Sequence, residues 1–104
     1  MRWPLTVVAV EGDSMAPAMW PGDFLLVSRA GRVRVGDAVM LRRPDHPGLL
    51  LVKRVRSRDP EGWWVEGDNH TRSDDSRLFG IVPDACILGR VVLRYWPPHR
   101  VGPV

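Results

Sequence analysis

Short apolar segments alternate along the chain with turns marked by glycine and proline. The apolar segments are rich in β-branched residues and have the length of single strands, which predicts β-structure. These predicted strands lie at residues 5–10, 23–28, 38–41, 49–58, 63–66, 78–82 and 87–95. Their near-regular spacing predicts a small, mainly β domain, folded as a coiled or partly closed barrel.

The composition fits one folded domain. The 104 residues include ten glycines and ten prolines, which argues against long helices. Hydrophobic residues make up 44% and charged residues 26%, which excludes a disordered chain. A chain of this size buries roughly 65% of its unfolded surface, enough for one core. We therefore expect a single domain over residues 1–104, with a frayed tail at 96–104.

Several classes of protein are excluded by what the sequence lacks. The single cysteine, Cys86, can form no internal disulfide and no cysteine-rich zinc site, and the three histidines lack metal-ligand spacing. No apolar run reaches the roughly 18 residues of a membrane span, and no signal-peptide-like stretch opens the chain. We expect a cytoplasmic protein without cofactor or metal. Peripheral membrane contact, for example through Trp20, is left open.

The only lysine of the chain lies at a position that suggests chemistry. Of the 15 basic residues, 14 are arginines, which never lose their proton in a protein, and one is Lys53, which can. A two-residue period over residues 49–58 places Lys53 on the apolar face of a strand and the arginines on the other. Desolvation there would lower its pKa and make it a general base. The alternative is a lysine whose amine reaches water at the rim of the sheet.

A serine at the end of the first predicted strand is a candidate nucleophile. Ser14 lies two residues after Gly12 and three before Pro17, so the turn can expose its hydroxyl beside free backbone N–H groups. The alternative is an ordinary cap or turn serine. The polar loop at residues 67–77 is dense in hydroxyls, carboxylates and arginine. It either braces a catalytic pair or is only a solvated loop.

Four blocks of the sequence, in this order, resemble the type I signal peptidases and their relatives, which are serine endopeptidases with a Ser/Lys dyad. The blocks are Gly12-Asp13-Ser14-Met15-Ala16-Pro17 with Pro21-Gly22-Asp23, Gly36-Asp37-Ala38-Val39, Leu51-Val52-Lys53-Arg54-Val55, and Gly67-Asp68-Asn69 with Ser73-Asp74-Asp75-Ser76-Arg77. Any one block is a weak signal, but four in order over residues 7–94 are specific. The resemblance implies a fold similar to the coiled, all-β catalytic core shared by signal peptidases and LexA-like proteins.

The resemblance also implies roles for individual residues. Ser14 would be the nucleophile, and its backbone N–H one oxyanion donor. Lys53 would be the neutral general base, and Ser73 would orient it. Met15, together with Asp13, would help shape the substrate cleft.

Two further roles follow from the same resemblance. Asp75 would pair with Arg54 and Arg77 and so hold the lysine strand against the loop. The substrate would be the extended N-terminal segment of a protein, bound as an added strand with small side chains before the cut.

The chain departs from the family pattern at one support position. Gly12 stands where many members carry a serine or threonine as second oxyanion donor, and losing such a donor can cost about 10²–10³ in rate. Among smaller relatives, the chain is similar to the nickel-type superoxide dismutase maturation proteases. This implies removal of a leader or propeptide, with a nickel superoxide dismutase precursor as the candidate substrate.

Other functions remain open at this point. One is cleavage of exported preproteins, as by a signal peptidase. Another is a nucleic-acid-binding β module that uses Arg54, Arg56 and Arg58, with Trp64 for stacking; the net charge of +3 permits this without requiring it. A third is a catalytically inactive relative. The ordered serine and lysine blocks favour the peptidase, so we expect no nucleic-acid partner.

Overall fold

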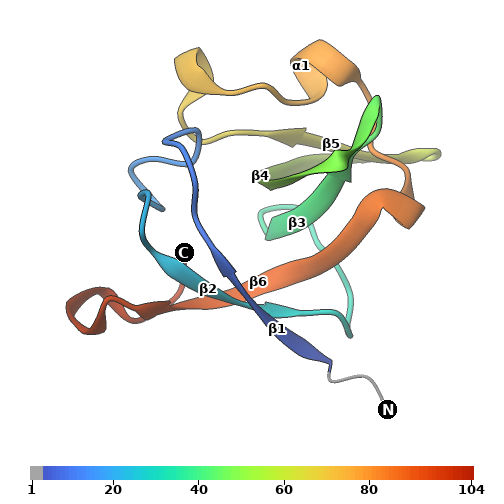
Figure 1. The fold of residues 1–104 in the computed structure, drawn as a ribbon. Coiled ribbons are helices and arrows are strands. Elements are labelled where there is room, and N and C mark those ends of the chain that lie inside the picture. The colour runs from blue at the N-terminus through green and yellow to red at the C-terminus, as the bar shows by residue number, and fades with distance from the viewer. Residues whose placement is uncertain (1–3) are drawn as a thin grey trace.

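Six antiparallel strands form one sheet in the computed structural model, which describes residues 4–104 (Figure 1). The strands are β1 (Leu5–Ala9), β2 (Phe24–Ser28), β3 (Ala38–Arg43), β4 (His46–Asp59), β5 (Gly62–Glu66) and β6 (Ile87–Trp96). Their order across the sheet is β1-β2-β6-β3-β4-β5. The remaining elements are short: α1 (Ser76–Phe79) and the 3₁₀ turns η1 (His70–Arg72), η2 (Asp84–Cys86) and η3 (Pro98–Arg100).

The expected mainly β class is confirmed, but the sheet is not closed into a barrel. Strand β1 pairs only with β2, and β5 pairs with β4, so these two strands are the edges. Closure would require pairing between the edges, and none is present within residues 4–104. The gap leaves the free edge of β1 across from the first half of β4.

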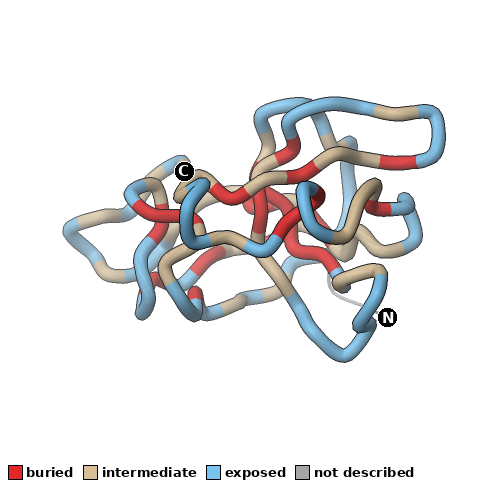
Figure 2. The backbone as a smooth tube through the Cα atoms, turned by 90° about the horizontal axis from the view of Figure 1, so that it is seen from above, coloured by how far each residue is buried: buried red, intermediate tan, exposed pale blue. Residues whose placement is uncertain are grey.

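The core forms two clusters because the central strand β3 is buried on both faces. Ala38 and Met40 pack into the first cluster with Met15, Met19 and other residues of the nucleophile turn and of β2 and β6. Val39 and Leu41, on the opposite face, pack into the second cluster with residues of β4 and β5. Figure 2 shows the buried segments at the centre, surrounded by exposed turns.

The prediction of a strand at residues 78–82 is wrong. The first two residues of this segment are the end of α1, whose N-cap is Asp75. The Asp75 carboxylate accepts a hydrogen bond from the Arg77 backbone N–H. Leu78 is 63% exposed, so its apolar character does not reflect core packing. Only Val82 is bridged in β fashion, to Trp63.

The tail expected to be frayed is held in place. Gly102 exchanges backbone hydrogen bonds with Arg94 of β6. Arg100 donates to the buried carboxylate of Asp23 at 2.8 Å, and the same carboxylate accepts from the Trp20 backbone N–H. The tail is therefore fixed to the turn that follows the candidate nucleophile, 77 residues away in sequence.

Candidate active site

The structure brings the candidate serine and lysine together. Ser14 lies on the turn after β1, and Met15 and Met19, which flank this turn, are buried in the first core cluster. Lys53 lies on β4 opposite Val39 of β3. The Lys53 Nζ atom is 2.9 Å from Ser14 Oγ, although 39 residues separate the two in sequence. This distance permits direct proton transfer between hydroxyl and amine.

Lys53 is buried, as the alternation along its strand predicted. Only 3% of the residue is exposed. Burial lowers the pKa of the ammonium group from its ordinary value of 10.5, and the carboxylates of Asp75 and Asp74 oppose this effect only in part. The alternative of a lysine reaching water at the sheet rim does not describe this structure. The amine is suited to lose its proton at a lower pH than an exposed lysine.

A hydrogen-bonded chain extends from the lysine into the protein. Lys53 Nζ lies 3.0 Å from Ser73 Oγ, and Ser73 Oγ donates to Asp75 Oδ2 at 3.0 Å. Asp75 Oδ2 also accepts from the Gly67 backbone N–H at 2.9 Å. Ser73 therefore holds the amine between two hydroxyls, with a fully buried carboxylate behind it.

Arg77 keeps that buried carboxylate ionised. Burial alone would raise the pKa of Asp75, but hydrogen bonds from the Arg77 side chain, from the Gly67 and Arg77 backbone N–H groups and from Ser73 hold it well below its usual range. The guanidinium donates to both carboxylate oxygens at 2.9 Å. A third donation, to the His70 carbonyl, links the same side chain to η1.

The expected pairing of Asp75 with Arg54 is wrong. Arg54 donates instead to both carboxylate oxygens of Asp68, at 3.2 and 2.8 Å, and also to the carbonyl of Val104. Arg54 pairs in register with Glu66 of β5, so the residue two positions beyond Glu66 lies within its reach. The lysine strand is thus held to the loop by Asp68, while Asp75 serves the serine and Arg77.

Two residues of the loop hold the turn that carries Ser14, and their individual roles were not foreseen. Asn69 donates from its backbone N–H to the Ser14 carbonyl at 2.8 Å, and from its side chain to the Asp13 carbonyl at 3.1 Å. Gly67 packs so closely that an added Cβ would lie 2.2 Å from Ser73 Oγ and 2.6 Å from the Ser14 carbonyl oxygen. Both residues belong to the Gly67-Asp68-Asn69 block, which was the available signal.

Replacing Gly67 with alanine is expected to separate the serine from the lysine. The methyl group must displace Ser73 or the Ser14 backbone, since both contacts are far below van der Waals distance. We expect kcat for peptide cleavage to fall about 10²-fold or more, as for other misplacements near 1 Å. Gly48→Ala is the matched control, because its added Cβ would be 3.7 Å from the nearest side chain. Equal kcat values for the two variants would contradict this packing role.

The burial of the Lys53 amine should make the free energy of unfolding depend on pH. The folded-state pKa of Lys53 is below the unfolded value, so the unfolded chain binds more protons between these two pKa values. The free energy of unfolding should therefore rise with pH across that window, by up to about 1.4 kcal/mol per pH unit, relative to Lys53→Met. Urea unfolding of both proteins from pH 6 to 10 measures this difference. A difference that stays constant with pH would contradict a depressed pKa.

The remaining candidate residues around the nucleophile lie on its turn. Gly12 has a φ of +70°, in the left-handed region, so a serine with an oxyanion-donating side chain would be strained there. Asp13 pairs with Arg72 of η1 at 2.9 Å. Met15 is 2% exposed and packs in the core, so its contribution to a cleft would be to support the turn from below. Within residues 4–104, the Ser14 backbone N–H has no hydrogen-bond acceptor, which leaves it free to bind an oxyanion.

A groove lies between the chain segments that precede the serine and the lysine. It has a volume of about 330 Å³ and lies between residues 7–9 of β1 and residues 50–52 of β4, with Met40 of β3 at its base. On the β4 side, residues 46–53 pair with β3 alone, because β5 pairs only with the second half of the strand. Two unpaired strand edges thus face the groove. Lys53 directly follows the β4 segment that lines it, and Ser14 lies five residues after the β1 segment.

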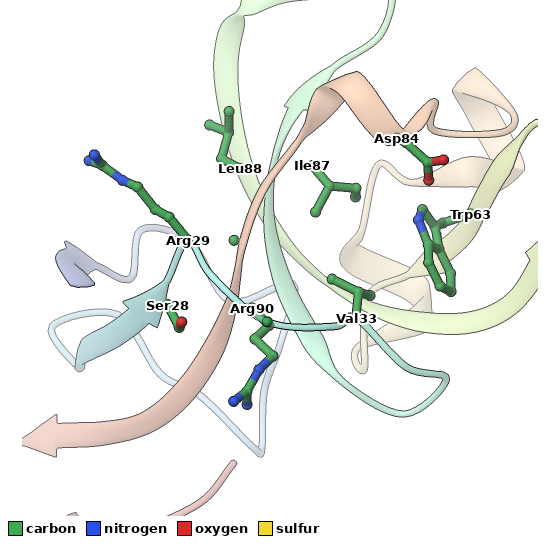
Figure 3. Close-up of a pocket in the computed structure, with 10 residues that line it drawn as sticks. Ser28, Arg29, Val33, Trp63, Asp84, Ile87, Leu88 and Arg90 are labelled. Atoms are coloured by element: carbon green, nitrogen blue, oxygen red, sulfur yellow. The ribbon is translucent and has the colours of Figure 1, made fainter. Parts of the chain in front are cut away.

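The arginines considered for nucleic-acid binding are held in ion pairs, and a second pocket lies apart from Ser14 and Lys53. Arg56 and Arg58, candidates for nucleic-acid binding, pair with Asp68 and Asp84. A pocket of about 240 Å³ lies between the β2–β3 loop and β6 (Figure 3), lined in part by Trp63, Asp84 and Arg90. Neither the serine nor the lysine lines this pocket.

Comparison with known proteins places the chain in a family. Residues 3–92 match the family model described as Peptidase S24-like. The chain belongs to the Peptidase S24-like family. The expected resemblance is confirmed at this level, that of a signal-peptidase-like peptidase family with a mainly β core. The finer similarity to nickel superoxide dismutase maturation proteases stays a prediction.

Similar proteins are also proteases by name. The chain is 32% identical to mitochondrial ATP-independent inner membrane protease subunit 1a of Arabidopsis thaliana, covering 97% of this chain and 76% of the relative. It is 34% identical to mitochondrial inner membrane protease subunit 1 of Xenopus tropicalis, over 94% and 73%. Subunit 2 of the protease from Schizosaccharomyces pombe is also 34% identical, over 94% and 68%. Across residues 4–104 of this Peptidase S24-like chain, no helix is long and apolar enough to cross a membrane.

Proposed function

We propose that this protein is a serine endopeptidase in which Ser14 is the nucleophile and Lys53 the general base. The observation that carries the proposal is the 2.9 Å separation of a hydroxyl from a buried amine whose pKa is lowered. The neutral amine takes the Ser14 proton as Oγ attacks the substrate carbonyl. The ammonium so formed then protonates the leaving amine, and the resulting acyl-enzyme is hydrolysed by a water that Lys53 deprotonates.

The groove supports an extended peptide as substrate. A strand lying between β1 and β4 could hydrogen-bond to both free edges, which is the β-augmentation mode of peptide recognition. Both flanking segments run toward the catalytic pair, so a peptide parallel to them ends with its carboxyl group beside Ser14. The walls of the groove are mostly apolar, which favours apolar side chains in the bound segment.

The substrate class that we propose is a protein precursor with an N-terminal leader or propeptide. A nickel superoxide dismutase precursor is the first candidate, and an exported preprotein is the second. Both require the same chemistry and differ only in the sequence presented to the groove. Some relatives are named as inner membrane proteases. Contact of this protein with a membrane surface is therefore a further property to examine.

Cleavage of a leader tests this proposal directly. The purified protein is incubated with each precursor, and mass spectrometry identifies new N-termini. We expect one precursor to gain a defined new N-terminus with the wild-type protein and none with Ser14→Ala. Cleavage that persists in Ser14→Ala would contradict the assigned nucleophile. Turnover of neither precursor, nor of a pool of alanine-containing leader peptides, would contradict the proposed activity.

A further inference from the structure

We infer that the groove selects leaders by charge order, with a basic side chain close to the scissile bond and an acidic side chain farther toward the N-terminus. The inference rests on the proposed function, because it concerns the peptide that occupies the groove. It follows from three charged side chains along otherwise mainly apolar walls: Glu11 at the catalytic end, and Arg29 and Arg42 at the far end.

The groove is continuous from Glu11, three residues before Ser14, to this far end. The cavity that Glu11 lines and a second cavity of about 510 Å³ share Val7, Val8, Met40 and Leu50 as lining residues. The first cavity alone includes Glu11, and the second alone includes both arginines. A single extended peptide can therefore contact one acidic and two basic side chains at different points along its length.

Glu11 lies three residues before the nucleophile, at the mouth of the groove. It is exposed, and within residues 4–104 it has no ion-pair partner. Its charge is thus not neutralised by the described part of the chain. A positively charged side chain of the peptide would be attracted there, and a negatively charged one repelled.

Arg29 and Arg42 face the opposite end of the groove. Arg42 donates to the Pro47 carbonyl, and neither arginine pairs with a carboxylate in the described residues. Arg29 also lines the pocket of Figure 3, where its side chain extends away from Trp63 and Asp84. Both guanidinium groups are available to a carboxylate of the substrate.

The spacing of these charges gives the register of the preferred residues. Glu11 and Val7 are separated by four positions, roughly 13 Å of extended chain. Glu11 lies three positions before Ser14, so a basic residue three or four positions before the cut would lie near Glu11. An acidic residue four or five positions farther toward the N-terminus would lie near the arginines.

Two peptides with the same composition test the charge order. In the matched peptide, Arg-Arg lies three and four residues before an alanine cleavage site, and Glu-Glu lies four positions farther upstream; in the swapped peptide, the pairs are exchanged. Adjacent pairs ensure that one side chain faces the groove in either register. Binding of fluorescent peptides to Ser14→Ala is measured first, and kcat/KM is measured with the wild-type protein.

We expect the matched peptide to be favoured about threefold to tenfold in both measurements at low salt, and less at 0.5 M salt. Glu11→Lys should reduce or reverse the preference, whereas Glu61→Lys, the same change on the β4–β5 turn, should leave it unaltered. Equal affinity for both peptides, or no binding of either, would overturn the charge order. Binding with the expected preference but no cleavage would instead contradict the catalytic proposal and leave the charge order standing.

Discussion

Lys53→Arg is expected to lower kcat for leader cleavage by about 10²–10⁴-fold, the range that general acid–base groups contribute. The substitution keeps a positive charge and hydrogen-bond donors near Ser14 but removes the capacity to accept a proton, because arginine stays charged in proteins. The measurement is kcat with a cleaved leader peptide, beside a thermal unfolding curve for each variant.

A charged guanidinium in a buried site can also unfold the protein, so a second variant is needed. Lys53→Met fills the same space with an apolar chain and cannot act as a base. It should show the same loss of kcat while remaining folded. Arg56→Lys, on the same strand but exposed, is the control and should retain kcat within about twofold. A folded Lys53→Met protein with wild-type kcat would refute the role of the amine.

Asp75→Asn is expected to destabilise the fold by about 2–3 kcal/mol and to reduce kcat about tenfold. The buried carboxylate accepts hydrogen bonds from Ser73, Gly67 and Arg77, and an amide cannot accept all of them. The loss should be smaller than the roughly 3–5 kcal/mol typical of a broken buried ion pair, because Arg77 is 41% exposed and can turn to water. Urea unfolding measures the first effect, and kcat the second.

The neighbouring carboxylate provides the control. Asp74 is 68% exposed and lies 3.6 Å from Arg43, so Asp74→Asn should change the free energy of unfolding by less than about 0.5 kcal/mol. Equal effects of the two substitutions would mean that burial and hydrogen bonding of Asp75 do not brace the site.

The placement of Lys53 could be predicted because it depends on a local rule. Alternation along a strand fixes the face of each side chain, and burial then lowers the pKa of an amine on the apolar face. The short helix α1 could also have been predicted locally, from its N-cap residue, but the apolar Leu78 suggested a strand instead. Asp75 is a favourable N-cap residue directly before Ser76, and this outweighs the β propensity of the segment.

Other features depend on contacts between distant segments. The partner of Arg54 required the register of the β4–β5 hairpin, which places Asp68 rather than Asp75 near the guanidinium. The position of the tail depends on the hydrogen bond from Arg100 to Asp23, which no local sequence pattern predicts. The sheet likewise stays open because its edge strands, β1 and β5, do not pair with each other within residues 4–104, which strand lengths alone do not show.

The protonation state of the single lysine is the central claim, and one measurement tests it most directly. Because Lys53 is the only lysine, protein labelled with ¹³C at lysine Cε gives one lysine Cε signal whose chemical shift reports its titration. The structure predicts a midpoint below the ordinary 10.5, and a rise of kcat/KM with pH through the same midpoint. A midpoint at or above 10.5 would contradict the account of Lys53 as a base.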